Sequence, residues 1–225
     1  MEINFIGIGG AFNTELGSNA AYIKEDNKIL FIDFGLDTFE KVVKHKLIDD
    51  VNEVYVLLTH LHGDHVGGLP TFIQYSYICF NKRVKLINNS ESFTNEVQKL
   101  LKITAVQETN YEFVDINTLP FSFKVRLRLT THTPLLECYS IIFVEEQGKT
   151  LYTSDTNDIE YLKQAIDDST FTKIYTEVGE YASVHTDYEL LKKLDRKKLI
   201  LMHIESEELY KKVLKEGYKI PEYLK

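Results

Sequence analysis

The chain has 225 residues, of which 44% are hydrophobic and 27% are charged, and its formal net charge is −8 at pH 7. This length and composition are typical of a globular protein with a sizeable core, and we expect residues 1–225 to form a single domain. The negative charge disfavours a protein that grips a nucleic-acid backbone over a long footprint. A small anionic substrate is still compatible with it, because a bound metal ion can reverse the local field.

The first residues lack the cationic and apolar regions of a signal peptide, and no apolar run approaches the roughly 20 residues that span a bilayer. We therefore expect a soluble cytoplasmic protein that does not associate with a membrane. The two cysteines, Cys79 and Cys138, lie in apolar runs and have no partner at metal-ligand spacing. We expect both to be buried free thiols.

The first half of the chain alternates between short apolar strands and helices. Asp37 and Glu40 have the spacing of a capping box at the start of one helix. The apolar run 51–59 predicts a strand that is buried on both faces of a sheet. Strands are predicted at 2–7, 19–24, 28–34, 51–59 and 83–88, and helices at 37–47, 65–78 and 90–102.

The second half repeats this pattern, and Thr186 with Glu189 predicts another capping box. Many strands in each half, with helices between them, predict an α/β fold in which two sheets pack face to face with helices outside, an αββα sandwich. Strands are predicted at 111–115, 121–130, 138–145, 149–154, 172–178 and 198–203, and helices at 158–168, 187–194 and 206–216.

The stretch THLHGDHVGG places four candidate metal ligands directly after a predicted strand. His60 and His62 are two residues apart, so in extended backbone both point to one side. Gly63 permits a sharp turn, after which Asp64 and His65 begin a helix. Imidazole nitrogens and a carboxylate that converge beyond a strand end suit Zn²⁺ or a similar ion. In the alternative, Asp64 is only a helix cap and the histidines are solvated, which three histidines within six residues disfavour.

The pattern H-x-H-x-D-H after a buried strand resembles the defining motif of the metallo-β-lactamase superfamily, whose fold is an αββα sandwich. The later ligand positions also occur in order, with His132 in THTP, Asp155 in YTSDT and His203 in LMHIES. The resemblance implies one metal ion held by His60, His62 and His132, a second held by Asp64, His65 and His203, and Asp155 as the bridge between them.

The resemblance implies two divalent cations, for which Zn²⁺ is the best fit, while Mn²⁺ also suits His and Asp ligands. Two cations about 3.5–4 Å apart that share a carboxylate and a hydroxide lower the pKa of the bound water and stabilise developing charge. Asp155, at a position where some lactamases carry Cys, points to a two-metal site. His62 argues against the di-iron flavoprotein branch, which carries a carboxylate there.

Two further segments resemble the ribonuclease Z branch of the superfamily. FIGIGGAFNTELGSNAAYI resembles its opening, whereas a dinucleotide-binding fingerprint fails because Phe12 stands where Gly or Ala is required. YTEVGEYASVHTDYELLKKL resembles its segment with a carboxylate and a histidine before a helix. The resemblance casts His185 as a group near the leaving oxygen, Glu177 as its orienting partner, and Asp64 as the group that orients or deprotonates the nucleophile. Alternatively, His185 is an exposed loop residue and Glu177 a surface carboxylate.

The tRNA-processing members of this branch carry a long arm between the positions of His132 and Asp155. Here the intervening residues 133–154 hold only two predicted strands and a turn, and no basic patch compensates for the missing arm. A nucleic-acid polymer is therefore disfavoured as substrate. The chain is similar to armless phage enzymes that hydrolyse cyclic nucleotides and counteract the bacterial Pycsar defence, and a phage-encoded chain would act in the host cytoplasm.

We predict a phosphodiesterase that converts 3′,5′-cyclic mononucleotides to linear monophosphates. The alternatives are a tRNA 3′-end endonuclease, a lactone or thioester hydrolase of the same fold, and a metal-binding protein that has lost catalysis. The resemblance also implies a homodimer, with the Tyr- and Phe-rich region 71–80 as a candidate interface, although such an aromatic stripe is also typical of core. The remaining histidine, His45, is interpreted as part of a solvated helix face.

Overall fold

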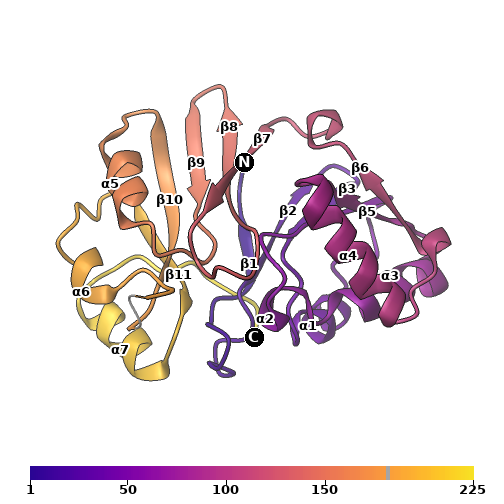
Figure 1. Ribbon diagram of the computed structural model, residues 1–225, viewed down its shortest axis with the longest axis horizontal. Coiled ribbons are helices and arrows are strands. Elements are labelled where there is room, and N and C mark those ends of the chain that lie inside the picture. The colour runs from indigo at the N-terminus through magenta and orange to yellow at the C-terminus, as the bar shows by residue number, and fades with distance from the viewer. Residues whose placement is uncertain (181–182) are drawn as a thin grey trace.

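The computed structural model describes residues 1–180 and 183–225, and within them the strands form two mixed sheets of six and five strands. The first sheet has the strand order β1-β2-β3-β4-β5-β6, and the second has the order β11-β10-β9-β8-β7. Figure 1 shows α1, α3 and α4 on one side of the molecule, α5, α6 and α7 on the other, and the strands between them. The predicted αββα sandwich is thereby confirmed.

The first sheet combines antiparallel and parallel pairing. β1 pairs with β2 and β2 with β3 in antiparallel fashion, whereas the pairs from β3 to β6 are parallel and are connected through helices. Its elements, with the helices that accompany them, are β1 (Asn4–Gly7), β2 (Ala20–Glu25), β3 (Lys28–Ile32), α1 (Thr38–Lys44), β4 (Glu53–Leu57), α2 (Gly63–Val66), α3 (Leu69–Phe80), β5 (Val84–Ile87), α4 (Glu91–Ile103), η1 (Glu108–Asn110), β6 (Tyr111–Val114) and η2 (Ile116–Thr118).

The second sheet is also mixed. β7, β8 and β9 form an antiparallel meander, and β9, β10 and β11 are parallel. Its elements are β7 (Lys124–Thr130), β8 (Cys138–Glu145), β9 (Gly148–Tyr152), α5 (Ile159–Asp167), β10 (Phe171–Val178), α6 (Tyr188–Leu191), β11 (Leu199–Ile204) and α7 (Glu207–Lys215).

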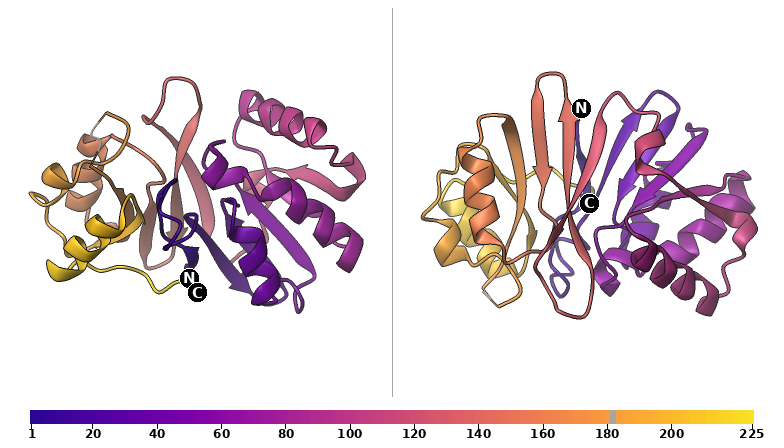
Figure 2. Two further views of the ribbon diagram at one scale, coloured as in Figure 1. Left: turned by 90° about the horizontal axis from the view of Figure 1, so that it is seen from below. Right: turned by 45° about the horizontal axis from the view of Figure 1, so that its top comes forward.

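Strand β4 shows how the sequence builds the layers, because successive side chains of a strand point to opposite faces. Val54 and Val56 belong to the apolar cluster that contains the helix residues of α3 and α4. Tyr55 and Leu57 belong to the cluster that contains the facing strand β8, including Ile141. All four β4 side chains are buried, as the continuous apolar run predicted. Figure 2 shows the two sheets between the outer helices.

The predicted helix 65–78 is wrong as a single element, because the structure has α2 and α3 in its place. The chain passes through Gly67 and Gly68 between them, and Pro70 lies in the first turn of α3, where a missing backbone N–H costs no hydrogen bond. Three predicted boundaries differ by three residues, since α1 ends already at Lys44, β7 begins only at Lys124 and α6 ends already at Leu191.

Neither predicted capping box forms. Asp37 precedes α1, but its carboxylate accepts a hydrogen bond of 2.8 Å from the backbone N–H of Ser18 and makes no cap to its own helix. The side chain that caps α6 is that of Asp187, while the hydroxyl of Thr186 donates to the carbonyl of Thr156. The side chains of Asp37 and Thr186 therefore form hydrogen bonds to other segments of the chain instead of capping a helix.

The prediction for the cysteines is half right. Cys138 is buried at the start of β8, but Cys79 is exposed. Cys79 lies in the last turn of α3, beyond Ser76, the last residue of this helix that is buried. His45 is exposed at the end of α1, as predicted. None of the helices in the described part of the chain is long and apolar enough to cross a membrane.

Candidate metal centre

The carboxyl end of β4 positions the first histidines and the aspartate of the motif. His60 follows the strand and is fully buried, and His62 has extended backbone (φ −67°, ψ 151°) as the residue before α2. Asp64 and His65 lie within α2 and are both buried. The parallel pairing of β4 with β3 and β5 places this turn at the end of the first sheet.

The second sheet contributes the other candidate ligands. His132 follows β7, Asp155 follows β9, and His203 lies in β11, one residue before its end. All three side chains are buried. The backbone of His203 has a φ of 45°, in the left-handed region that few residues other than glycine adopt.

The structure brings all seven predicted ligands together. They form two groups in which one candidate ligand atom from each residue lies within 4.8 Å of the others, and Asp155 belongs to both groups. The first group is His60, His62, His132 and Asp155, and the second is Asp64, His65, Asp155 and His203. These groups match the two sets that the sequence resemblance implied.

The residues present fit divalent cations. His65 Nε2 and Asp155 Oδ1 are buried and have no hydrogen-bond partner among the described residues, a costly arrangement unless another group binds them. In the first group, Nδ1 of His62 lies 3.0 Å from His60 Nε2 and 3.2 Å from His132 Nε2. Imidazole nitrogens and carboxylate oxygens that converge in this way are the donors that bind Zn²⁺ and similar ions.

The electrostatics of the centre favour ionised carboxylates. Burial alone would raise the pKa of Asp155, but the charges of His203 and His65 hold it well below the usual value. Burial lowers the pKa of His203, but the charge of Asp155 and the hydrogen bond to Asp64 raise it to about 10. Burial, with the charge of His65, lowers the pKa of His60 well below the usual value. A cation bound in the second group would take the place of protons on these imidazoles, as metal binding to histidine requires.

Asp33 is a residue of the centre that the sequence analysis did not identify. Its fully buried carboxylate accepts a hydrogen bond of 2.8 Å from His65 Nδ1, and the backbone N–H and hydroxyl of Thr59 also donate to it. This contact fixes the orientation of the His65 ring and leaves Nε2 free for a ligand. The only sequence signal was a lone aspartate after the apolar strand β3, a position that more often marks a turn.

Glu177 and His185 lie beside the second group. With Asp155 and His203 they form a third cluster of possible ligand atoms within 4.8 Å. Nδ1 of His185 donates a hydrogen bond to Oε2 of Glu177, whose other oxygen accepts from the backbone N–H of Thr186. Glu177 is fully buried and His185 is half-buried, so the alternatives of a surface carboxylate and an exposed loop histidine are wrong.

The environment of His185 changes its titration. Burial would lower the pKa of its imidazole, but the hydrogen bond and the charge of Glu177 raise the pKa above its usual value. His185 therefore holds a proton at a higher pH than a solvated histidine does. A protonated imidazole at the edge of a ligand cluster is a suitable general acid.

A cavity of about 560 Å³ opens onto these groups. Its rim carries the exposed side chains of Phe12 and Leu36. The cavity is lined by Ala11, Phe12, Leu36, His62, Gly63, Asp64, His132, Thr133, Asp155, Val184, His185 and His203.

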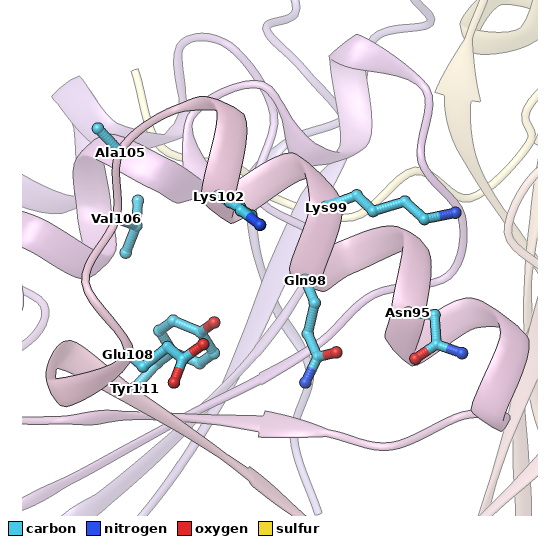
Figure 3. Close-up of a pocket in the computed structure, with 8 residues that line it drawn as sticks. All are labelled: Asn95, Gln98, Lys99, Lys102, Ala105, Val106, Glu108 and Tyr111. Carbon is cyan, nitrogen blue, oxygen red and sulfur yellow. The ribbon is translucent and has the colours of Figure 1, made fainter.

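A second cavity of about 620 Å³ lies along α4 and is drawn in Figure 3. The described residues around that cavity include Lys99 and Lys102 but no histidine, so the candidate chemistry belongs to the first cavity.

The region between His132 and Asp155 is a hairpin, as predicted. β8 and β9 pair from Ile141 with Tyr152 to Glu145 with Gly148, so the connection between the strands is a tight turn. The chain therefore has no inserted arm at this place.

Comparison with known proteins agrees with this geometry. The chain matches the family described as "Anti-Pycsar protein Apyc1" over residues 1–219. It is 27% identical over 219 residues to the anti-Pycsar protein Apyc1 of Paenibacillus harenae, covering 90% of this chain and 89% of that protein. It is 25% identical over 235 residues to Apyc1 of Bacillus phage 010DV004, covering 90% and 88%. A ribonuclease Z of Sulfolobus acidocaldarius is 34% identical over 86 residues, which are 38% of this chain and 29% of that enzyme.

Solved structures share the fold at low sequence identity. The metallo-β-lactamase fold protein YhfI of Bacillus subtilis is similar with a TM-score of 0.74 at 14% identity, covering 99% of this chain and 95% of that one. Human tRNase Z, short form, has a TM-score of 0.68 at 15% identity, covering 99% and 96%. The protein has the metallo-β-lactamase fold, and fold and family together support a metal-dependent hydrolase. From the match over residues 1–219, the chain belongs to the anti-Pycsar Apyc1 family.

Proposed function

We propose that the protein hydrolyses 3′,5′-cyclic mononucleotides to linear monophosphates and thereby counteracts cyclic-nucleotide defence signalling. The observation that carries the proposal is that residues of both ligand groups and His185 line one cavity of about 560 Å³. A cavity of this size accommodates a small molecule rather than a polymer. Membership of a family named for opposing Pycsar supports the proposed biological role.

The proposed metal ions are two divalent cations, one for each ligand group. The imidazole-rich donor set favours Zn²⁺, and Mn²⁺ also suits it. When bound, the cations would neutralise phosphate charge and lower the pKa of a water molecule between them. The proposed ligands are His60, His62 and His132 for the first ion, Asp64, His65 and His203 for the second, and Asp155 for both.

Asp64 is the proposed group that orients or deprotonates the attacking water. Burial would raise the pKa of its carboxyl, but the hydrogen bond from His203 and the charges of His65 and His203 hold that pKa below the usual value, so the carboxylate is ionised. Asp64 also lines the cavity, and its Oδ2 lies 3.3 Å from His203 Nε2. An ionised carboxylate at this position accepts hydrogen bonds from a water molecule and directs its lone pair toward phosphorus.

His185 is the proposed acid that protonates the leaving ribose oxygen. Its Nδ1 is engaged by Glu177, so Nε2 is the nitrogen that can serve the cavity. Glu177 holds the imidazole in place and is itself held by backbone N–H groups of Thr156 and Thr186. When the P–O bond breaks, its electron pair stays on the ribose oxygen, which takes the proton from His185.

The charge and the hairpin argue against a tRNA substrate. The net charge of −8 gives little attraction for a polyanion, and the tight β8–β9 connection leaves no arm to hold one. A lactone or thioester hydrolase would use the same centre. A protonated His185 suits an alkoxide leaving group, as in a phosphodiester, better than the weakly basic thiolate of a thioester.

The test is hydrolysis of a panel of 3′,5′-cyclic nucleotides by Zn²⁺- or Mn²⁺-loaded protein, with metal content measured in parallel. Wild type should give linear monophosphates. Asp64→Ala and Asp155→Ala should lose about a thousandfold or more of kcat/KM, while the exposed Asp49→Asn variant should match wild type. Turnover of precursor tRNA or a thioester, with no turnover of the panel by metal-loaded protein, would contradict the proposal.

We also propose that the protein forms a homodimer through α3. The region 71–80 is only partly core, because Phe72 and Ile73 are buried whereas Ile78 is 76% exposed. Tyr75, Tyr77 and Phe80 of the same helix are also only half-buried, and an exposed apolar surface of several side chains favours an interface. Sedimentation analysis should give a dimer mass for wild type and a monomer mass for Ile78→Glu, and a monomeric wild type would contradict the proposal.

A further inference from the structure

Phe12 is held in an ordered turn although its ring is 95% exposed. The backbone N–H of Asn13 donates to the carbonyl of Gly10 at 2.9 Å, which closes a turn with Ala11 and Phe12 at its two central positions. Gly, Asn, Asp, Ser and Pro are the residues that such turns favour. A large aromatic side chain at the tip is therefore not explained by the turn itself.

The turn is fixed beside the candidate metal centre. The backbone N–H of Gly10 donates to the carbonyl of Ile204 at 2.9 Å, and the side-chain amide of Asn13 donates to the same oxygen at 3.1 Å. Ile204 directly follows His203, and a methyl group at Gly10 would lie 3.4 Å from Cε1 of that histidine. The position of Phe12 relative to the ligands is thus set by hydrogen bonds.

Packing in the core does not explain the aromatic side chain of Phe12 either. Phe12 belongs to neither apolar cluster of the core, yet it lines the cavity of about 560 Å³. Leu36, which is 67% exposed, lines the same cavity, and the carboxylate of the next residue, Asp37, accepts a hydrogen bond from the N–H of Ser18. The cavity therefore has ligand atoms at its floor and apolar side chains at its rim.

This division of the cavity matches the two ends of a nucleotide. The phosphate belongs at the floor, where the ligand groups converge, and the flat face of a base belongs against an aromatic ring. We propose that Phe12 is a positioning residue on which the base of the substrate stacks, an inference that rests on the proposed function. Stacking of this kind requires no hydrogen bonds to the edge of the base.

The absence of tryptophan from the chain allows a direct binding test. Phe12→Trp introduces a single tryptophan, whose emission should be quenched when the metal-loaded variant binds the non-hydrolysable Rp-phosphorothioate of cyclic AMP. Base-free ribose 3′,5′-cyclic phosphate should leave the emission unchanged. The matched control is Ile103→Trp, at an 81% exposed site that does not line the cavity, and its emission should not respond to either compound. Equal responses of the two variants would overturn the proposal.

A kinetic test separates stacking from a structural role. Phe12→Ala should raise KM for cyclic AMP by about fivefold to a hundredfold, with a smaller change in kcat, and Phe12→Tyr should restore most of the loss. The preference for cyclic AMP over the base-free compound, as a ratio of kcat/KM values, should fall by the same factor. An unchanged ratio would overturn the proposal. The proposal would also fail if Phe12→Ala changed the oligomeric state and that change accounted for the whole rise in KM.

The two tests also distinguish this inference from the function on which it rests. If wild type hydrolyses neither cyclic phosphate while the nucleotide still quenches Phe12→Trp, the proposed hydrolysis fails and base stacking stands. If wild type hydrolyses both compounds and the preference ratio is unaffected by Phe12→Ala, stacking fails and the proposed hydrolysis stands.

Discussion

His65 Nδ1 donates a hydrogen bond of 2.8 Å to Oδ2 of Asp33, and neither side chain is exposed to solvent. Thr59 secures the same carboxylate through its backbone N–H at 2.7 Å. The ring of His65 is therefore fixed with Nε2 toward Asp64 and Asp155, at 3.2 and 3.4 Å from their oxygens. A group that is neither a candidate ligand nor exposed to the cavity thus determines which nitrogen of His65 reaches the centre.

We predict that Asp33→Asn weakens metal binding at the second group. The amide keeps the size of the side chain but loses the charge that supports His65, and such changes typically cost about 10- to 100-fold in metal affinity. Zn²⁺ affinity measured by chelator competition should fall by this factor, while Asp49→Asn keeps the wild-type value. Unaltered affinity in Asp33→Asn would show that the contact does not support metal binding.

We predict that the basic limb of the pH–rate profile depends on Glu177. A general acid is active while protonated, so the rate should fall as pH rises through the raised pKa of His185. Glu177→Gln removes a hydrogen-bonding charge that raises this pKa, and the falling limb should move to lower pH. His185→Ala should lower kcat by about 10²- to 10⁴-fold, and the exposed His45→Ala should retain the wild-type profile. A limb that stays in place in Glu177→Gln would exclude this coupling.

We predict that alanine substitution changes the free energy of unfolding differently at two glycines near the centre. A methyl group at Gly35 would lie 2.0 Å from the backbone oxygen of Asp64 and 2.4 Å from Cβ of Ser18, so Gly35→Ala must push these segments apart. We expect a loss of about 1–3 kcal/mol in the free energy of unfolding. Gly63→Ala meets nothing within 4 Å and should be neutral or slightly stabilising, because alanine favours a helix. Thermal melts of the metal-free variants check this, and equal melting temperatures would refute it.

We predict that one of the two thiols reacts in the native protein. Cys79 is exposed, whereas burial raises the pKa of Cys138 to about 12. The thiolate is the reactive form, so Cys138 stays unreactive near neutral pH. A chromogenic disulfide reagent at pH 8 should titrate one thiol in native protein and two in denaturant. Cys79→Ser should give no native signal, and rapid labelling of that variant would contradict the assignment.

The convergence of the seven candidate ligands was predictable because its signals are local. His60 and His62 share one extended segment, and Asp155 and His203 follow or end apolar strands, so residue type and spacing sufficed together with the family resemblance. Asp33 was not predictable in this way, because its partner His65 lies 32 residues later and only the packed fold joins them. A buried carboxylate with a distant partner resembles a turn residue in sequence.

The incorrect element predictions have the same physical origin. Asp37 and Thr186 have the residue types of helix caps, but each forms a hydrogen bond with a segment far along the chain. Cys79 lies in an apolar run, yet the end of α3 extends past the core. Local pattern predicts what a residue is able to do, and tertiary contacts decide which of these options it uses.

Asp155 belongs to both candidate ligand groups, and this has a consequence for how the centre fills. A cation in one group would withdraw charge from Asp155 and restrict its orientation, and it would thereby alter the affinity of the other group. Thermodynamic linkage requires this influence to be equal in both directions. If both groups bind metal, they would act as one coupled receptor, and a titration with metal should follow a cooperative or anticooperative isotherm rather than the sum of two independent ones.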